Sequence, residues 1–233
     1  MRQAPTSSQR NPWTSTNLAQ FMNKVYLFMT LGLLITAMVA YTLSTQTQII
    51  AVLAQSTGLF IGLIALQLGA VFLFSRSINQ TQSKSAILLF LIYSALTGVT
   101  FGLIGQMYTN ASIGYAFTLS AGSFLGLSIV GFTTKKDLSP IASFCIMGLW
   151  GLIIGVVMSY FVPSLQTQSM NHVFGAIGVI VFAGLTAYDT QRIKNTARHG
   201  ETSALAALSG AFMLYLDFIN LFISILRLVG DRR

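Results

Sequence analysis

Long apolar stretches separated by short polar clusters run along almost the whole chain. Residues 25–75, 85–134 and 138–188 contain no Asp, Glu, Lys or Arg, and these blocks are 51, 50 and 51 residues long. One helical crossing of a bilayer needs about 20 residues, so each block has room for two crossings and a turn. Uncharged polar clusters at 44–48, 108–112 and 163–168 mark the turns. The pattern predicts three helical hairpins.

A further apolar segment, from about 204 to 229, predicts a seventh helix. The runs are too continuous for a membrane β-barrel, which shows short alternating segments. Spans in lipid must satisfy their backbone groups internally, and this favours helices. The fold class expected is all-α, a polytopic bundle of seven transmembrane helices made of three hairpins and a seventh helix. The expected spans are 25–44, 50–74, 86–107, 112–133, 140–161, 171–191 and 205–229.

Composition and charge agree with a membrane protein and suggest its orientation. The chain is 54% hydrophobic and only 8% charged, with 13 Lys and Arg against 5 Asp and Glu. Ten of the cations fall in the N-terminal arm and in the connectors after the second, fourth and sixth spans, and the three hairpin turns hold none. The positive-inside rule therefore predicts a cytoplasmic N-terminus. The cations form no stripe, so no nucleic-acid partner is expected.

This orientation predicts a polar cytoplasmic arm at 1–20 and a membrane domain at 21–233. Only Arg227, Arg232 and Arg233, at the C-terminus, oppose the charge trend. Seven crossings put the C-terminus outside. If the last segment instead dips in and returns, both ends are cytoplasmic.

The sequence offers no motif for catalysis or for a bound cofactor. It has no nucleotide-binding motif, no Ser-His-Asp order and no metal-type histidine cluster, and Cys145 is its single cysteine. Glycines recur inside the third, fourth and fifth predicted spans, where small residues let helices approach closely in lipid. We expect a protein that is not an enzyme and has no cofactor, with the lipid bilayer as its surroundings.

Two aspartates within predicted spans are the candidate functional residues. Asp217 lies near the middle of the seventh span, and Met213, Asn220, Ser224 and Arg227 fall on the same helical face. A polar stripe of this kind is unfavourable in lipid and is expected to face the bundle interior. Asp189 lies at the end of the sixth span. Because these spans are consecutive and antiparallel, their two carboxyl groups are expected to meet.

Two adjacent carboxylates away from water share a proton. The protonated pair would be a latch between two helices, and the deprotonated pair would repel or attract a cation such as Ca²⁺. In the other interpretation, each aspartate only bonds backbone or arginine partners and staples the bundle. The spacing alone leaves both interpretations open.

At these residues the sequence resembles the Bax-inhibitor-1-like family of seven-helix membrane proteins, in its bacterial inner-membrane branch. The resemblance covers about residue 20 to the C-terminus. It rests on FTTKKDLS at 132–139, GLTAYDTQRIK at 184–194 and LYLDFINLFISILRLVG at 214–230, with a softer match in SALTGVTFG at 94–102. It implies a multi-pass protein of the bacterial inner membrane that acts as a pH-sensitive Ca²⁺ leak channel, with protons and Ca²⁺ as its small partners.

The resemblance also implies roles for individual residues. The family's pH sensor and latch fall on Asp189 and Asp217, which would also be transient Ca²⁺ ligands. Arg76 matches a basic residue that engages the open latch. Gln67 stands where some members carry a pore-facing glutamate, and the amide lacks the charge that concentrates a cation. On the faces of the two acids, Asn220 and Thr186 are further candidates for latch partners or pore-lining residues.

The family suggests a second class of function. Some bacterial relatives resemble modulators of a membrane-bound AAA protease, and eukaryotic relatives resemble suppressors of cell death in stress survival. A modulator needs a tail or helical face for its partner and no pore. An intramembrane aspartic protease fits worst, because Asp217 lacks the glycines of a Gly-x-Gly-Asp motif.

Overall fold

The computed structural model describes residues 15–162 and 165–232, and the described chain folds into helices without a named strand. The helices, in chain order, are α1 (Ser15–Ser44), α2 (Thr47–Gln55), α3 (Thr57–Asn79), α4 (Ser83–Met107), α5 (Asn110–Thr133), α6 (Ser139–Phe161), α7 (Gln168–Arg198) and α8 (Ala204–Val229). Seven of them, all except the nine-residue α2, are long and apolar enough to cross a membrane. The all-α, seven-span prediction is confirmed.

The predicted boundaries needed correction at three helices. The first span, expected at 25–44, begins earlier, since α1 starts at Ser15. The second span, expected at 50–74, is divided at Ser56, whose extended backbone (φ −99°, ψ 98°) ends α2. The Ser56 hydroxyl accepts a hydrogen bond from the N–H of Leu59 and so caps α3. The sixth span, expected to end at 191, continues as α7 to Arg198. Arg192, Lys194 and Arg198 therefore lie in a helix and not in a connector.

The polar arm predicted at 1–20 falls mainly outside the described residues, which begin at Ser15. Residues 15–20 form the first turns of α1.

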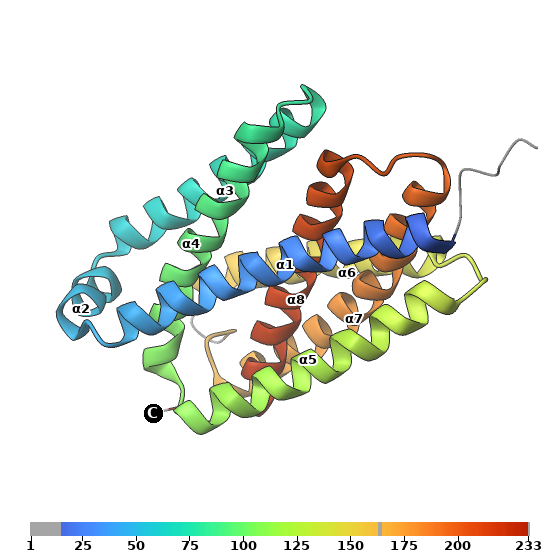
Figure 1. The fold of residues 1–233 in the computed structure, drawn as a ribbon. Coiled ribbons are helices and arrows are strands. Elements are labelled where there is room, and N and C mark those ends of the chain that lie inside the picture. Colours follow the sequence, from blue (N-terminus) through green and yellow to red (C-terminus); the bar gives the residue numbers. More distant parts are fainter. Residues whose placement is uncertain (1–14, 163–164, 233) are drawn as a thin grey trace, which may run out of the picture.

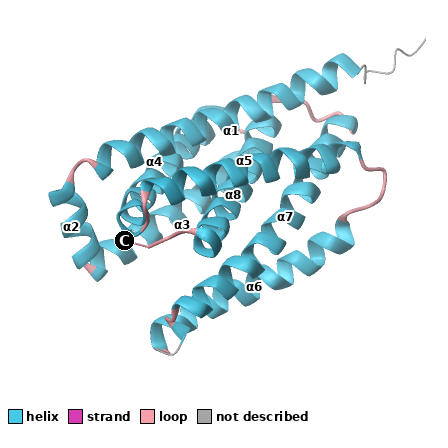
Figure 2. Ribbon diagram, turned by 90° about the horizontal axis from the view of Figure 1, so that it is seen from below, coloured by secondary structure: helices cyan, strands magenta, loops and turns pink. Residues whose placement is uncertain are grey.

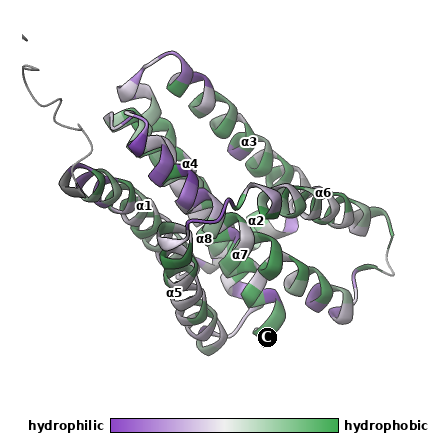
Figure 3. Cartoon of the chain, turned by 90° about the vertical axis from the view of Figure 1, so that its right-hand side faces the viewer, coloured by the Kyte–Doolittle hydropathy of each residue, from purple (hydrophilic) through white to green (hydrophobic). Residues whose placement is uncertain are grey.

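Helix α8 runs through the centre of the bundle, with α1, α5 and α7 packed around it (Figure 1). Of its most apolar 18-residue window, 61% is buried, against 11–33% for the other spans. The α6–α7 hairpin lies to one side (Figure 2). Apolar residues cover most of the helices, including the outward surfaces (Figure 3), where Phe72 and Trp150 are 68% and 62% exposed. A core that is narrow and an outside that is apolar are expected for helices solvated by lipid.

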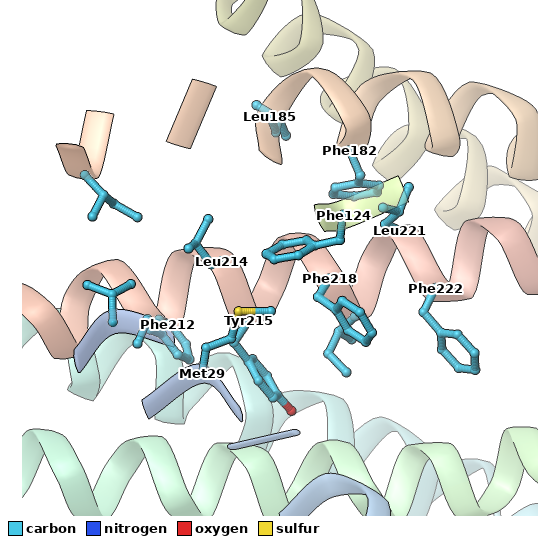
Figure 4. Packing of buried hydrophobic residues seen from close by; sticks show 14 of the residues in the cluster. Met29, Phe124, Phe182, Leu185, Phe212, Leu214, Tyr215, Phe218, Leu221 and Phe222 are labelled. Atoms are coloured by element: carbon cyan, nitrogen blue, oxygen red, sulfur yellow. The ribbon is translucent and has the colours of Figure 1, made fainter. Parts of the chain in front are cut away.

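Aromatic side chains of α8 fill the core. Phe182 and Leu185 of α7 and Phe124 of α5 point toward α8 (Figure 4). The rings of Phe74 and Phe212 are 4.3 Å apart, those of Phe124 and Phe218 are 5.6 Å apart, and those of Phe101 and Phe222 are 5.3 Å apart. These contacts join α3, α4 and α5 to the central helix.

A buried hydrogen bond ties α8 to α1 within this core. The hydroxyls of Tyr215 and Thr36 are 2.7 Å apart, and Thr36 also donates to the carbonyl of Ser94 at 2.9 Å. We expect Tyr215→Phe to lower the free energy of unfolding by about 1 kcal/mol, the usual net worth of a buried neutral hydrogen bond. Unfolding by SDS in mixed micelles measures this, with Tyr41→Phe, whose ring is 75% exposed, as the matched control. Equal losses in both variants would contradict the assignment.

The C-terminus lies at the opposite end of the bundle from the start of α1 (Figure 1). Helix α8 runs unbroken to Val229, and the residues that follow are bound to the α4–α5 turn. The N–H of Thr109 donates to the carbonyl of Asp231 at 3.1 Å, and the N–H of Asp231 donates to the Ser112 hydroxyl at 2.9 Å. The last helix therefore does not dip in and return. We call this end, with the α1–α2, α4–α5 and α6–α7 turns, the turn end.

Candidate functional site: a buried aspartate pair between α7 and α8

Asp217 is held in the middle of the most buried helix. Its side chain is 5% exposed, and it lies inside α8, far from either end of the helix. Asp217 Oδ2 is fully buried and has no hydrogen-bond partner among the described residues. A carboxyl group without neighbouring donors at this depth is costly unless it holds a proton or shares one.

The partner of Asp217 is Asp189, which α7 brings to it. The two carboxyl groups lie close enough to interact directly. Ionised carboxylates only accept hydrogen bonds, so the two groups can bond to each other only if they share a proton. Asp189 is half-buried, and the Arg192 guanidinium, one helical turn further, is its electrostatic neighbour. The site is therefore a pair of carboxyl groups between consecutive helices.

Two glycines of α7 allow α8 to approach so closely. A Cβ atom added at Gly175 would lie 2.9 Å from the carbonyl oxygen of Ser224, and one at Gly178 would lie 2.9 Å from the Cβ of Ser224. No larger residue fits at either position without separating the helices. The sequence reasoning missed both glycines. Their spacing of three residues, on the helix facing the polar stripe of α8, was the available signal.

Two more α7 residues, also missed as functional, hold the α5–α6 connector. Gln191 donates from Nε2 to the carbonyl of Lys136 at 2.8 Å and accepts from the N–H of Leu138 at 3.1 Å. The Lys194 ammonium donates to the carbonyl of Phe132 at 2.7 Å, and Lys194 is only 3% exposed. Counting Lys194 with the connector cations was wrong, because it caps the C-terminal end of α5 inside the protein. The motifs at 132–139 and 184–194 are thus bound to each other.

A polar cavity of about 380 Å³ opens at the C-terminal end of α7. Tyr188 and Arg192, which flank Asp189 in the sequence, belong to its lining. The other lining residues are Asp137, Ser139, Gln191, Asn195, Thr196, His199 and Glu201. Neither Asp189 nor Asp217 is among the described residues that line it.

The remaining predicted site residues are spread over the bundle. Thr186 is buried and donates to the carbonyl of Phe182 at 2.7 Å, and Asn220 donates to the carbonyl of Leu216 at 2.8 Å. Gln67 of α3 donates to the Thr100 hydroxyl of α4 at 2.9 Å. Arg76 is exposed near the end of α3, and the guanidinium next to the pair is that of Arg192. The structure brings Asp189 and Asp217 together, and the roles assigned to the other four stay predictions.

In the described chain, six apolar spans around a central seventh, which shares a buried aspartate pair with α7, define a class of integral membrane protein. The chain belongs to the Bax inhibitor-1-like family, whose model, described as "Inhibitor of apoptosis-promoting Bax1", matches residues 18–233. It is 41% identical over 221 residues to the inner membrane protein YbhL of Escherichia coli strain K12, which covers 93% of each chain.

Two other bacterial relatives match over a similar share of the chain. An uncharacterized protein of Borreliella burgdorferi is 41% identical over 218 residues, covering 92% of this chain and 93% of the relative. An uncharacterized protein of Deinococcus radiodurans is 37% identical over 235 residues, covering 100% of this chain and 98% of the relative. The family model therefore spans the stretches of the chain that contain Asp189 and Asp217.

Proposed function

We propose that this protein is a proton-responsive cation leak of the bacterial inner membrane, with a cytoplasmic N-terminus and Ca²⁺ as the permeant ion. The inner-membrane relative and the distribution of Lys and Arg support the location and orientation. The aspartate pair is the proposed pH sensor and latch. Its position, between two helices that contact each other along their length, supports a role in holding them together.

The observation that carries this proposal is a row of polar residues on one face of α8, formed by Asp217, Asn220, Ser224 and Arg227. Asp189 of α7 faces the row at Asp217, and Gly178 of α7 faces it at Ser224. The row ends at Arg227, which lines a second cavity, of about 400 Å³, at the turn end. Polar groups inside a span are costly in lipid and mark ion or proton pathways.

The pair would control this row through its proton. With one proton, the hydrogen bond between Asp189 and Asp217 joins α7 to α8, and the glycines of α7 stay packed against Ser224. Without it, two negative charges repel at short range and the latch is lost. The separated carboxylates are hard oxygen ligands that suit Ca²⁺. Flux is therefore expected to rise as the pH rises through the titration of the pair.

Ca²⁺ flux into liposomes at pH values from 5 to 8 tests the proposal. Because the latch binds one proton, wild-type flux should change by up to about tenfold per pH unit. Asp217→Asn and Asp189→Asn keep a hydrogen-bond donor that does not titrate, so both should give low flux at every pH. Asp217→Ala removes the latch and should give high flux at every pH.

Asp137→Asn is the matched control, since it removes a carboxylate near the same end of α7. The N–H and the hydroxyl of Ser139 bond the exposed Asp137 carboxylate and hold its pKa below its usual range. Asp137 therefore stays ionised from pH 5 to 8, and its loss should leave the pH dependence intact. The same pH profile in all variants would remove the gating mechanism. Absence of flux in every protein would remove the leak and favour the protease-modulator class.

A further inference from the structure

An apolar groove of about 450 Å³ lies between α1, α4, α5 and α8 and reaches the central helix. Its lining is made mainly of alkyl and aromatic side chains, among them Leu33, Phe101, Ile113, Phe117 and Phe222. None of the described residues that line it is charged. Helices α1 and α4 pack against each other, whereas α5 packs on α7 and α8 and has no comparable contact with α1 or α4. The groove is therefore an opening in the bundle along α5.

The groove is elongated and spans about one leaflet of the membrane. Its lining in α1 runs from Leu33 to Ser44, a length of about 16 Å at 1.5 Å per residue. The hydrocarbon core of a bilayer is about 30 Å thick, so one leaflet contributes about half of it. Ser44 ends α1 at the turn end, and the lining residue Asn110 begins α5 there. The groove thus runs from the membrane surface at the turn end toward the middle of the bilayer.

The surface around the groove already faces lipid. Met38 and Tyr115, which follow the lining residues Ala37 and Gly114 in the sequence, are 70% and 59% exposed. Protein interiors hold few voids larger than a water molecule, and an apolar space does not bind water. Because the groove continues a surface that acyl chains cover, an acyl chain is the ligand that matches its chemistry and its shape.

We propose that this groove binds one acyl chain of a phospholipid from the leaflet at the turn end. The chain lies against Phe218 and Phe222, whose side chains point to the same side of α8 (Figure 4). The Phe222 ring is 5.3 Å from that of Phe101 on α4 and 6.4 Å from that of Phe117 on α5, so three helices offer one apolar surface. The headgroup stays at the turn end, and the uncharged groove does not select it.

Photolabelling of the purified full-length protein in detergent micelles tests this proposal. The probe is phosphatidylcholine with a diazirine in one acyl chain, titrated by mole fraction, and the labelled peptides are identified by mass spectrometry. Lipid that only surrounds the protein reaches exposed helices such as α6. A chain in the groove should also label residues 218–226 of α8, the most buried span. Phosphatidylglycerol with the same chain should reach half-maximal labelling at the same mole fraction.

Gly114→Leu is the main variant, because its side chain would fill the groove from α5. A Cβ at Gly114 meets nothing within 4 Å, so leucine does not displace the backbone. The mole fraction for half-maximal labelling of 218–226 should rise at least about tenfold, the effect of displacing about two methylene groups from apolar contact. Gly122→Leu is the matched control. It is on the same helix and meets nothing within 4 Å, but it is not among the described lining residues and should label like the wild type.

Labelling confined to the exposed helices would overturn the groove as a lipid site, and so would equal titrations of Gly114→Leu and Gly122→Leu. A lower half-maximal mole fraction for one of the two headgroups would overturn the acyl chain as the part that is recognised. Labelling of α6 gives the internal reference in every sample. This readout does not depend on ion flux, so it stands or falls separately from the proposed leak.

Discussion

Replacing Gly131 by alanine, which adds one methyl group, is expected to destabilise the protein more than the same replacement at any other described glycine. A Cβ at this position in α5 would lie 2.9 Å from the carbonyl carbon of Ala187 in α7, and closer still to the carbonyl oxygen. These are backbone atoms of a helix, so no side chain can move aside and the helices must separate. We expect a loss of about 3 kcal/mol or more, the upper part of the range for overpacked cores.

Gly126→Ala is the matched control for this prediction. Gly126 is on the same helix, and a Cβ there would meet nothing within 4 Å. Alanine is the better helix former, so this change should be neutral or stabilising by up to about 1 kcal/mol. Unfolding of both variants by SDS in mixed micelles gives the comparison. Similar stabilities would mean that α5 and α7 do not touch at Gly131.

Replacing Lys194 by methionine is expected to cost about 2–3 kcal/mol, although the two side chains have similar lengths. The Lys194 ammonium bonds the carbonyls of Phe132 and Thr134, at 2.7 and 3.4 Å, where α5 ends. It also lies 5.7 Å from the centre of the Phe132 ring. Methionine fills the space and leaves these carbonyls without their charged donor, which costs more than a neutral hydrogen bond.

Lys135→Met is the control for Lys194→Met. Lys135 is an exposed cation in the same α5–α6 connector, and its replacement should change the free energy of unfolding by less than about 0.5 kcal/mol. The same denaturation experiment measures both. If the two variants lose equal stability, Lys194 is a solvated cation, as the sequence had first indicated.

Gly131 and Lys194 belong to one structural unit with the aspartate pair. Ala187, against which Gly131 packs, is two residues before Asp189, and Gln191, two residues after it, bonds the α5–α6 connector. The Thr190 hydroxyl lies 3.4 Å from that of Ser128 on α5. The segment of α7 that carries the pair is therefore held by α5 on one side while α8 contacts it on the other. Gly131→Ala is expected to disturb the latch as well as the stability.

The sequence by itself determined the number of membrane spans and singled out Asp189 and Asp217 as the two acidic residues within them. Charge-free blocks of about 50 residues with polar centres specify hairpins, because lipid excludes charge and requires helices. The polar face of α8 had to turn inward for the same reason, and Asp217 is 5% exposed. Such inferences succeed because they depend only on the order of residues and on the bilayer as solvent.

The tertiary structure alone decided which polar groups pair. Lys194 reads as one more connector cation, and only the approach of α5 shows that it caps that helix. Gln67 and Arg76 both lie on α3, and only the structure shows that Gln67 bonds α4 and that Arg192 is the charged neighbour of Asp189. Gly131 and Gly126 look alike along the chain, but one meets a backbone and the other meets nothing. Periodicity fixes the face of a helix, whereas the register and distance between two helices depend on packing between residues far apart in sequence.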